Sequence, residues 1–355
     1  MTLRGSEVTG QGDAAALFIP RSIRSTSSGQ KGIHSRMRHL HPEIDARLGW
    51  AHGVDPAQLM TDPELRSRLS HSYFTMDDEE SPVVKYEQFD ISNDECPYPV
   101  SIRLYRTQSK SATSAVVLVH GGGFLGGTVD DQESDGVARE IVTRTGAAVV
   151  SVDYRLASQE HHFPHLHHEV LAAFKWTCSP GGLELNPASV VLLGASAGAS
   201  LCATATLELR ERSDELPAGL VLLYPLLFKL SPPADSPYDI DRVPAIFRIL
   251  QPSVEFMFDS YLGPEALRSN GVHGSLDDET LDGLPPSLVV AAAYDDLAGH
   301  AHEFASRATR DGSVVRLIDV PGMPHGFLQL PRSIDQVGRS LEAIATFVDE
   351  QTGPR

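Results

Sequence analysis

The feature that most constrains the fold of this chain is a set of short apolar runs that alternate with helical patterns. The runs are Ala115–His120, Ala147–Asp153, Val190–Gly194, Leu220–Tyr224, Leu288–Tyr294 and Val314–Val320. Continuous runs of this length are typical of strands that are covered on both faces, as in parallel sheets. Apolar spacing of three or four, as in a helix, is found in Asp135–Arg144, His165–Thr177, Ala199–Arg212 and Ile334–Asp349. The alternation predicts an α/β fold, with a mostly parallel central sheet flanked by helices.

Two other regions have different patterns. Residues 1–81 lack buried-strand runs and contain only short helical stretches such as Asp62–Leu69, so we expect a separate N-terminal segment there. The α/β domain then covers residues 82–355. It opens with Val83–Ile91 and Pro99–Tyr105, whose alternating apolar residues predict an antiparallel pair of strands.

A long insertion interrupts the alternation between Pro225 and Pro285. A structureless loop of that length is uncommon in a compact domain, so we expect residues 226–285 to form helices of their own. The insertion follows a strand, on the side of the sheet where α/β proteins bind ligands. We therefore predict that it caps a site together with the N-terminal segment.

The amino-acid composition and net charge exclude some classes of binding partner. With 41% apolar residues, the chain of 355 residues can bury a large core. The 47 acidic and 29 basic residues give a formal charge of −18, which argues against binding to nucleic acids or anionic membranes. A neutral or cationic small molecule fits this charge better.

The cysteine content and the apolar stretches give an expectation for the cellular location of the protein. Cys96, Cys178 and Cys202 form no CxxC pair, so they predict neither a disulfide framework nor a zinc site, and they favour a reducing cytoplasm. The apolar run Ala14–Pro20 is too short for the core of a signal peptide. No stretch approaches the roughly 20 apolar residues of a membrane span.

The strongest local motif is Gly194-Ala195-Ser196-Ala197-Gly198, between a predicted strand and a predicted helix. In this context a GxSxG sequence is typical of a nucleophile elbow, a strained turn that lifts the serine oxygen above the sheet. The flanking residues must be small so that strand and helix can approach. The alternative interpretation is a packing turn of small residues.

A second motif, His120-Gly121-Gly122-Gly123-Phe124, follows the strand Ala115–Val119 directly. Consecutive glycines leave backbone N–H groups accessible, and such groups can converge on the oxyanion of a tetrahedral intermediate. We predict Gly122, Gly123 and Ala197 as the donors, with His120 and Gly121 in support. A phosphate-binding loop is disfavoured, because neither GxGxxG nor a GK[ST] ending is present.

A serine nucleophile needs a base, and His325 lies in a Pro- and Gly-rich loop between a strand and the last helix. The acid that orients the base should follow the preceding strand, where Asp295 and Asp296 stand side by side. The resulting chain order of Ser, Asp and His is the one that this architecture requires. Spacing alone does not separate the two aspartates.

Taken together, these motifs resemble the hormone-sensitive-lipase-like family of α/β-hydrolase carboxylesterases. The resemblance rests on residues 120–124, 153–157, 194–198, 223–225, 283–286, 294–297 and 325–327 in the family's order. It implies hydrolysis of short to medium acyl esters through Ser196, His325 and Asp295, with no cofactor. A homodimer is common in the family.

The chain also departs from the family pattern. Ala195 stands where many members have an acid, Ala199-Ser200 where many have Gly-Asn, and Gly299 near a position that often holds a second acid. These differences bear on substrate range and pH profile more than on reaction type. The alternatives are hydrolysis of amides, carbamates or lactones by the same residues, or a non-catalytic small-molecule receptor on the same fold.

Two further clusters invite a functional interpretation. Asp153 and Arg155 could form an ion pair at the site, but we expect them to brace the loop after their strand. His165, His168 and Glu169, within the histidine-rich stretch His161–His168, would share a helical face with a spacing that can bind zinc. We predict no metal site there and expect helix-start chemistry and exposure instead.

Overall fold

The computed structural model describes residues 39–56, 58–65, 68, 82–107, 112–233, 238–264 and 272–353. Its sheet has eight strands in the order β1-β2-β4-β3-β5-β6-β7-β8. The strands are β1 (Tyr86–Ile91), β2 (Val100–Tyr105), β3 (Ala115–Val119), β4 (Ala148–Asp153), β5 (Val190–Ala195), β6 (Gly219–Leu223), β7 (Ser287–Tyr294) and β8 (Val315–Pro324). Strand β2 is antiparallel to β1 and β4, and all other pairs are parallel. The predicted strands and the antiparallel pair are confirmed.

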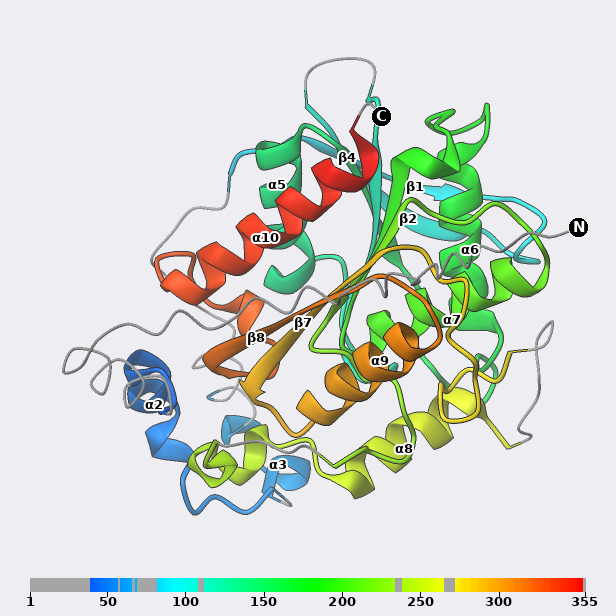
Figure 1. Ribbon diagram of the computed structural model, residues 1–355. Helices are drawn as coiled ribbons and strands as arrows, with labels where there is room; N and C mark the ends of the chain where they lie inside the picture. The colour runs from blue at the N-terminus through cyan, green and yellow to red at the C-terminus, as the bar shows by residue number, and fades with distance from the viewer. Residues whose placement is uncertain are drawn as a thin grey trace, which may run out of the picture. The chain divides into compact units, whose positions relative to one another are not determined.

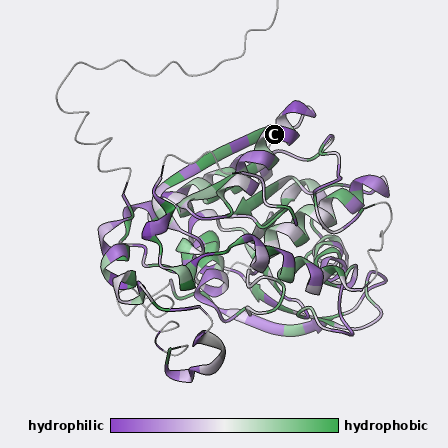
Figure 2. Cartoon of the chain, turned by 90° about the horizontal axis from the view of Figure 1, so that it is seen from below, coloured by the Kyte–Doolittle hydropathy of each residue, from purple (hydrophilic) through white to green (hydrophobic). Residues whose placement is uncertain are grey.

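Helices cover both faces of the sheet (Figure 1). The four predicted helices are α5 (Gln132–Thr145), α6 (His165–Cys178), α7 (Ala197–Glu211) and α10 (Asp335–Thr352). Buried residues of α6 and α7 belong to one apolar cluster, and those of α5 and α10 belong to the other. Figure 2 shows the hydrophobic strands inside and hydrophilic residues along the outer helices. The sheet is therefore the middle layer of three.

One helix was not predicted from the sequence. Helix α9 (Ala298–Arg310) packs on β7 and β8 with its alanines and Phe304 inward, in the same cluster as α6 and α7. Its inward face consists mostly of alanine and glycine, so apolar periodicity gave little signal.

The expectation that every parallel strand is covered on both faces is wrong for β8. Its first half alternates between half-buried and exposed residues, and Val314 just before it is 71% exposed. The reason is its position at the edge of the sheet, with β7 as its one neighbour in the sheet.

The insertion forms helices, as predicted. It contains the 3₁₀ turns η3 (Ile240–Arg242) and η4 (Ala245–Phe247), followed by α8 (Gln251–Leu262). Helix α8 has Pro252 in its first turn, where a missing N–H costs nothing. It buries Val254, Phe258 and Tyr261 in the cluster that includes α6 and α7.

The described part of the N-terminal segment is also helical. Helix α2 (Pro42–Leu48) buries Ile44 and Leu48, and the short α3 (Gln58–Thr61) follows. The helix predicted at Asp62–Leu69 lies partly outside the described residues. Residues 1–38 lie outside them too, including the apolar run Ala14–Pro20. No helix in the described ranges is long and apolar enough to cross a membrane.

Candidate active site

The turn between β5 and α7 holds Ser196 in a strained conformation. Its φ of 51° is in the left-handed region, which residues other than glycine rarely adopt. The neighbours of the turn must be small, because a Cβ on Gly194 would lie 2.2 Å from the carbonyl oxygen of Gly198, and one on Gly198 would lie 2.3 Å from that of Val119. The backbone N–H of Ser196 also donates to the carbonyl of Leu223, which ties the turn to β6. The GxSxG motif thus forms the predicted elbow.

Three residues from distant parts of the chain meet at this turn. The Nε2 atom of His325 lies 2.9 Å from Ser196 Oγ, and its Nδ1 atom lies 2.7 Å from Asp295 Oδ2. A carboxylate can only accept, so Nδ1 carries the proton and Nε2 of the neutral ring accepts from the serine hydroxyl. The other oxygen of Asp295 accepts from the N–H of Leu297. Asp295 is held by the residues that follow β7, and His325 by the loop that follows β8.

The structure separates the two adjacent aspartates that the sequence left open. Asp295 is buried and faces His325. The Asp296 carboxylate faces Arg248, whose Nε and Nη2 atoms donate to its two oxygens at 2.8 and 2.7 Å. It also accepts from the N–H of Ile249. Asp296 therefore anchors the inserted segment, and only Asp295 is bonded to the imidazole.

The charges around His325 favour its protonated form. Burial alone would lower the pKa of His325, but the nearby carboxylates of Asp295, Glu133 and Asp296 outweigh it and raise that pKa above 6.5. The bond to Asp295 contributes to the same direction. This environment suits a base that must hold a proton during a reaction.

The loop after β3 has its carbonyl groups bonded within the protein. The carbonyl of Gly121 accepts from His120 Nδ1 at 2.8 Å and from Tyr154 OH at 3.3 Å. The carbonyl of Gly122 accepts from the N–H groups of Leu125 and Gly126. In a trans peptide the N–H points opposite to the carbonyl, so the N–H groups of Gly122 and Gly123 face away from these partners.

Those two N–H groups and that of Ala197 are candidate oxyanion donors. In the described part of the chain, no protein acceptor lies within hydrogen-bonding distance of Gly122 N or Gly123 N. Ala197 is the first residue of α7, where helical N–H groups have no partner within the helix. Gly122 has a φ of 108°, and a Cβ there would lie 2.1 Å from the carbonyl oxygen of Gly126. The loop shape therefore requires glycine at this position.

Two buried side chains near the site were not predicted from the sequence. Glu133 on α5 accepts from the N–H of Gly121 and from the hydroxyl of Tyr224. The Tyr224 ring lies edge-on to His325, with centroids 5.1 Å apart. Tyr224 is part of a quoted family motif, but no pattern in the sequence distinguished Glu133.

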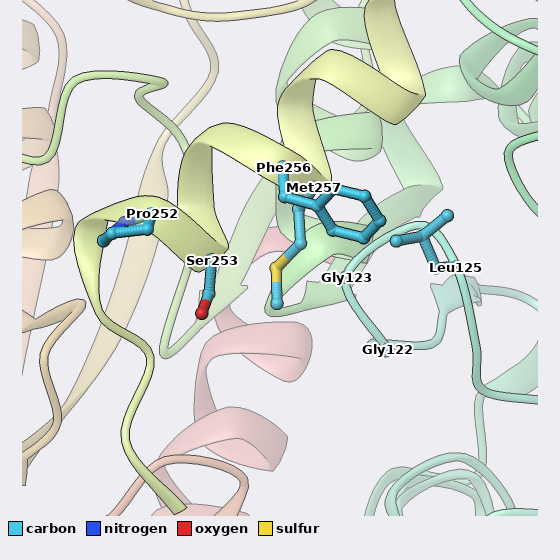
Figure 3. Close-up of a pocket in the computed structure, with 7 residues that line it drawn as sticks. All are labelled: Gly122, Gly123, Leu125, Pro252, Ser253, Phe256 and Met257. Carbon is cyan, nitrogen blue, oxygen red and sulfur yellow. The ribbon is translucent and has the colours of Figure 1, made fainter. Parts of the chain in front are cut away.

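A cavity of about 410 Å³ lies between the loop after β3 and the inserted helix α8 (Figure 3). Its walls are formed by Gly122, Gly123, Leu125, Pro252, Ser253, Phe256 and Met257. Figure 3 shows Phe256 and Met257 projecting from α8 toward the loop at Gly123 and Leu125. The surface is mainly apolar, with one hydroxyl from Ser253.

The described N-terminal residues reach the loop that leads to His325. The N–H of His41 donates to the carbonyl of Gly322, and Leu40 and Ile44 belong to the same apolar cluster as Phe327. The N-terminal segment thus supports the histidine loop, whereas α8 forms a wall of the cavity.

Arg155 braces its loop, as expected, but its partner is not Asp153. The guanidinium and the backbone N–H of Arg155 both bond to the buried carboxylate of Glu169, and the guanidinium stacks on Tyr98. The ion pair considered between Asp153 and Arg155 is therefore wrong. Of the three residues considered as a zinc-binding face, Glu169 bonds to Arg155.

The histidine-rich stretch instead contributes to a buried polar cluster that the sequence did not predict. His167 Nε2 lies 2.5 Å from Glu208 on α7, and His168 Nε2 lies 3.1 Å from the same carboxylate. His167 is fully buried, so the expectation of exposure fails for it. These three residues place one ligand atom each within 4.8 Å of one another, as a metal would need. Arg212 also bonds to Glu208, and its positive charge opposes a cation there.

Comparisons with known proteins agree with the fold and the motifs. The family described as having the alpha/beta hydrolase fold matches residues 116–329. An arylesterase of Saccharolobus solfataricus is 27% identical over 68% of this chain and 76% of its own. Carboxylesterase NlhH of Mycobacterium tuberculosis is 32% identical over 64% of this chain and 72% of its own. An esterase structure from Pyrobaculum calidifontis, 26% identical, superposes with a TM-score of 0.70 over 88% of this chain and 98% of that one.

The fold and the match over residues 116–329 define an α/β hydrolase. The chain belongs to the hormone-sensitive-lipase-like family of carboxylesterases within that class. The reaction that it catalyses is the hydrolysis of carboxylic esters.

Proposed function

We propose that the protein hydrolyses short- to medium-chain acyl esters through a covalent acyl-enzyme on Ser196. The observation that carries this proposal is the position of His325, which lies within hydrogen-bonding distance of both Ser196 and Asp295. This is the arrangement in which a serine hydroxyl becomes a nucleophile.

In the proposed mechanism, His325 removes the proton of Ser196 as Oγ attacks the ester carbonyl. The ring then carries a positive charge, which the buried carboxylate of Asp295 stabilises. His325 passes the proton to the leaving alcohol and the acyl-enzyme forms. A water molecule, activated by the same ring, releases the acid and restores the serine.

The N–H groups of Gly122, Gly123 and Ala197 are proposed to bind the oxyanion. A matched pair of variants tests this role. Gly122→Ala places a Cβ on the carbonyl of Gly126 and should displace the loop, whereas a Cβ at Gly126 has its nearest contact at 3.7 Å. We expect Gly122→Ala to lower kcat on the order of 10²–10³-fold. Gly126→Ala should change kcat little, and an equal loss in both variants would contradict the proposed role of the loop.

The cavity next to the oxyanion loop supports an apolar substrate of limited size. Phe256, Met257 and Leu125 offer contacts to an acyl or aryl group, and the volume of about 410 Å³ suits a short to medium chain. The name of the arylesterase relative is consistent with such a group. We propose that α8 acts as a cap whose side chains set chain-length preference.

Hydrolysis of p-nitrophenyl esters from acetate to palmitate tests the proposal, with the wild type and Ser196→Ala in parallel. We expect an optimum at short or medium chains and loss of turnover in the variant. Ser200→Ala is the control, because Ser200 is a buried serine one helical turn further along α7. Turnover that survives Ser196→Ala would contradict the proposed nucleophile.

Location and assembly also remain proposals. Cys96, Cys178 and Cys202 are free thiols, which is consistent with the predicted cytoplasmic location. A homodimer is proposed from the family resemblance. The proposed partner is a small-molecule ester, and the mechanism requires no cofactor.

A further inference from the structure

A buried glutamate, Glu133, is bonded to the loop that follows β3. Glu133 is in the first turn of α5 and is 8% exposed. Its Oε2 accepts from the N–H of Gly121 at 3.0 Å, and its Oε1 accepts from the hydroxyl of Tyr224 at 2.6 Å. An N–H can only donate, so Oε2 is an acceptor, and the two donors satisfy a carboxylate.

This carboxylate lies close to the proposed nucleophile and base. A Cβ on Gly121 would be 2.7 Å from Glu133 Oε2 and 3.3 Å from the Cβ of Ser196, so Gly121 lies close to both side chains. Tyr224 links the other oxygen to the base, since its ring lies edge-on to His325. Tyr224 is itself held in place, because its N–H donates to the carbonyl of Val290 at 2.6 Å.

The charge of Glu133 has no fixed cationic partner. Among the residues that the structure describes, no lysine or arginine forms an ion pair with it. Glu140, two turns further along the same helix, shows the contrast, because it is paired with both Arg144 and Arg332. A buried carboxylate without a cation is costly unless a positive charge forms nearby.

We propose that Glu133 is a positioning residue for ester hydrolysis, which fixes the oxyanion loop through Gly121 and stabilises the imidazolium of His325 as it forms. The proposal rests on the proposed role of His325 as base. Because the positive charge exists only after His325 has taken the serine proton, the interaction is stronger in the transition state than in the ground state. Such an interaction raises kcat rather than lowering KM.

Glu133 acts on His325 together with two other carboxylates. Asp295 bonds to the Nδ1 atom and raises the pKa of His325 most, whereas Asp296, which is paired with Arg248, raises it less than Glu133 does. Ser196 and Tyr224 are neutral neighbours, and His300 on α9 is kept neutral by burial, which lowers its pKa to about 3. Burial raises the pKa of Glu133, and the bonds from Tyr224 and Gly121, followed by the charge of His325, oppose that shift. This mutual effect is the one expected of a coupled pair.

Glu133→Gln tests the charge while keeping the size of the side chain. Its amide oxygen can still accept from the N–H of Gly121, and its NH2 group can donate to the hydroxyl oxygen of Tyr224. We expect kcat for p-nitrophenyl butyrate to fall roughly tenfold, less than for a direct oxyanion donor, with KM nearly unchanged. The acid limb of the pH profile of kcat/KM should move to lower pH, because His325 loses an anion that raises its pKa. Tyr224→Phe should lower kcat by a smaller factor and add little in the Glu133→Gln background.

Glu140→Gln is the matched control, since it removes a buried α5 glutamate whose charge is already paired. We expect it to lower the melting temperature and leave the acid limb in place. An unchanged acid limb in Glu133→Gln, with or without a loss of kcat, would reduce Glu133 to a structural role and overturn the inference. Ser196→Ala in the same assay separates the two proposals, because turnover in that variant would contradict the triad itself.

Discussion

Within the described residues, the histidine–carboxylate clusters around His325 and around His167 differ in whether a guanidinium group neutralises the carboxylate. In one, His325 bonds to Asp295 at 2.7 Å, and in the other, His167 bonds to Glu208 at 2.5 Å. Glu208 is also bonded to Arg212, whereas Asp295 has no arginine or lysine partner among the described residues. The anion of the second cluster is therefore neutralised by a guanidinium group, whereas the carboxylate of Asp295 faces His325 without a competing cation.

The pKa values of the two histidines follow from this difference. Burial lowers the pKa of His167 to about 4, although the bond to Glu208 opposes the shift. Around His325 the carboxylates outweigh burial, and its pKa is raised. One ring is thus kept neutral inside the protein, and the other is prepared to accept a proton. A short histidine–carboxylate contact alone does not identify a catalytic base.

Replacing each histidine by glutamine should separate the two clusters most clearly. We expect His325→Gln to lower kcat/KM for p-nitrophenyl butyrate on the order of 10⁴–10⁶-fold, because the base is lost. His167→Gln should keep turnover near that of the wild type and lower the melting temperature. Steady-state kinetics with a thermal melt of each variant measures both effects. Comparable kinetic losses in the two variants would remove the distinction.

The two carboxylates should differ in the same way. Asp295→Asn leaves the ring without its anion and should lower kcat by about 10⁴-fold. Asp296→Asn, the neighbouring control, should lower kcat far less. Glu208→Gln should instead destabilise the fold by about 1–3 kcal/mol, because it removes the buried carboxylate to which His167, His168 and Arg212 bond, although Arg212 keeps Glu95 as a partner. Urea unfolding measures the last effect, and a stable Glu208→Gln variant would contradict the assignment of that cluster to the fold.

The smallest expected effect is on the pH dependence of stability. His167 has a lowered pKa in the folded state, so between pH 6.5 and about 4 the unfolded chain binds more protons than the folded one. Its contribution to the free energy of unfolding is therefore present above pH 6.5 and lost as the pH falls toward 4. We expect His167→Gln to flatten this part of the curve, measured by urea unfolding. An unchanged slope would mean that His167 does not titrate as described.

Activity should also rise with pH, but over a higher pH range than the stability contribution of His167. The base must be neutral, so kcat/KM should rise with pH through the raised pKa of His325, above 6.5. A rate that is flat between pH 5 and 8 would contradict a histidine base.

The sequence predicted the parts that depend on local pattern. The elbow around Ser196 and the loop after β3 are contiguous motifs, and the β-strands show as apolar runs. Asp295 and His325 follow from chain order and resemblance. The sequence did not predict the edge position of β8, because the coverage of a strand depends on its neighbours in the fold. It did not predict α9 either, because the packing of small residues such as alanine also depends on tertiary neighbours.

The residues that sequence reasoning missed form contacts across long stretches of chain. Glu133 on α5 meets Tyr224 at the end of β6, and His167 on α6 meets Glu208 on α7. These contacts form only because the three helices pack on the sheet that contains β6. A single glutamate in a helix has no spacing that marks it as buried. The choice of Glu208 over Glu169 as the partner of the histidines was likewise decided by Arg155, which occupies Glu169.

Covalent labelling tests the central claim most directly. The protein is treated with a p-nitrophenyl phosphonate, and the modified residue is located by mass spectrometry of its peptides. We predict one adduct, on Ser196, whose rate of formation rises with pH above 6.5 and which is absent from Ser196→Ala. No adduct on a protein that hydrolyses esters, or an adduct on another residue, would contradict Ser196 as the nucleophile activated by His325.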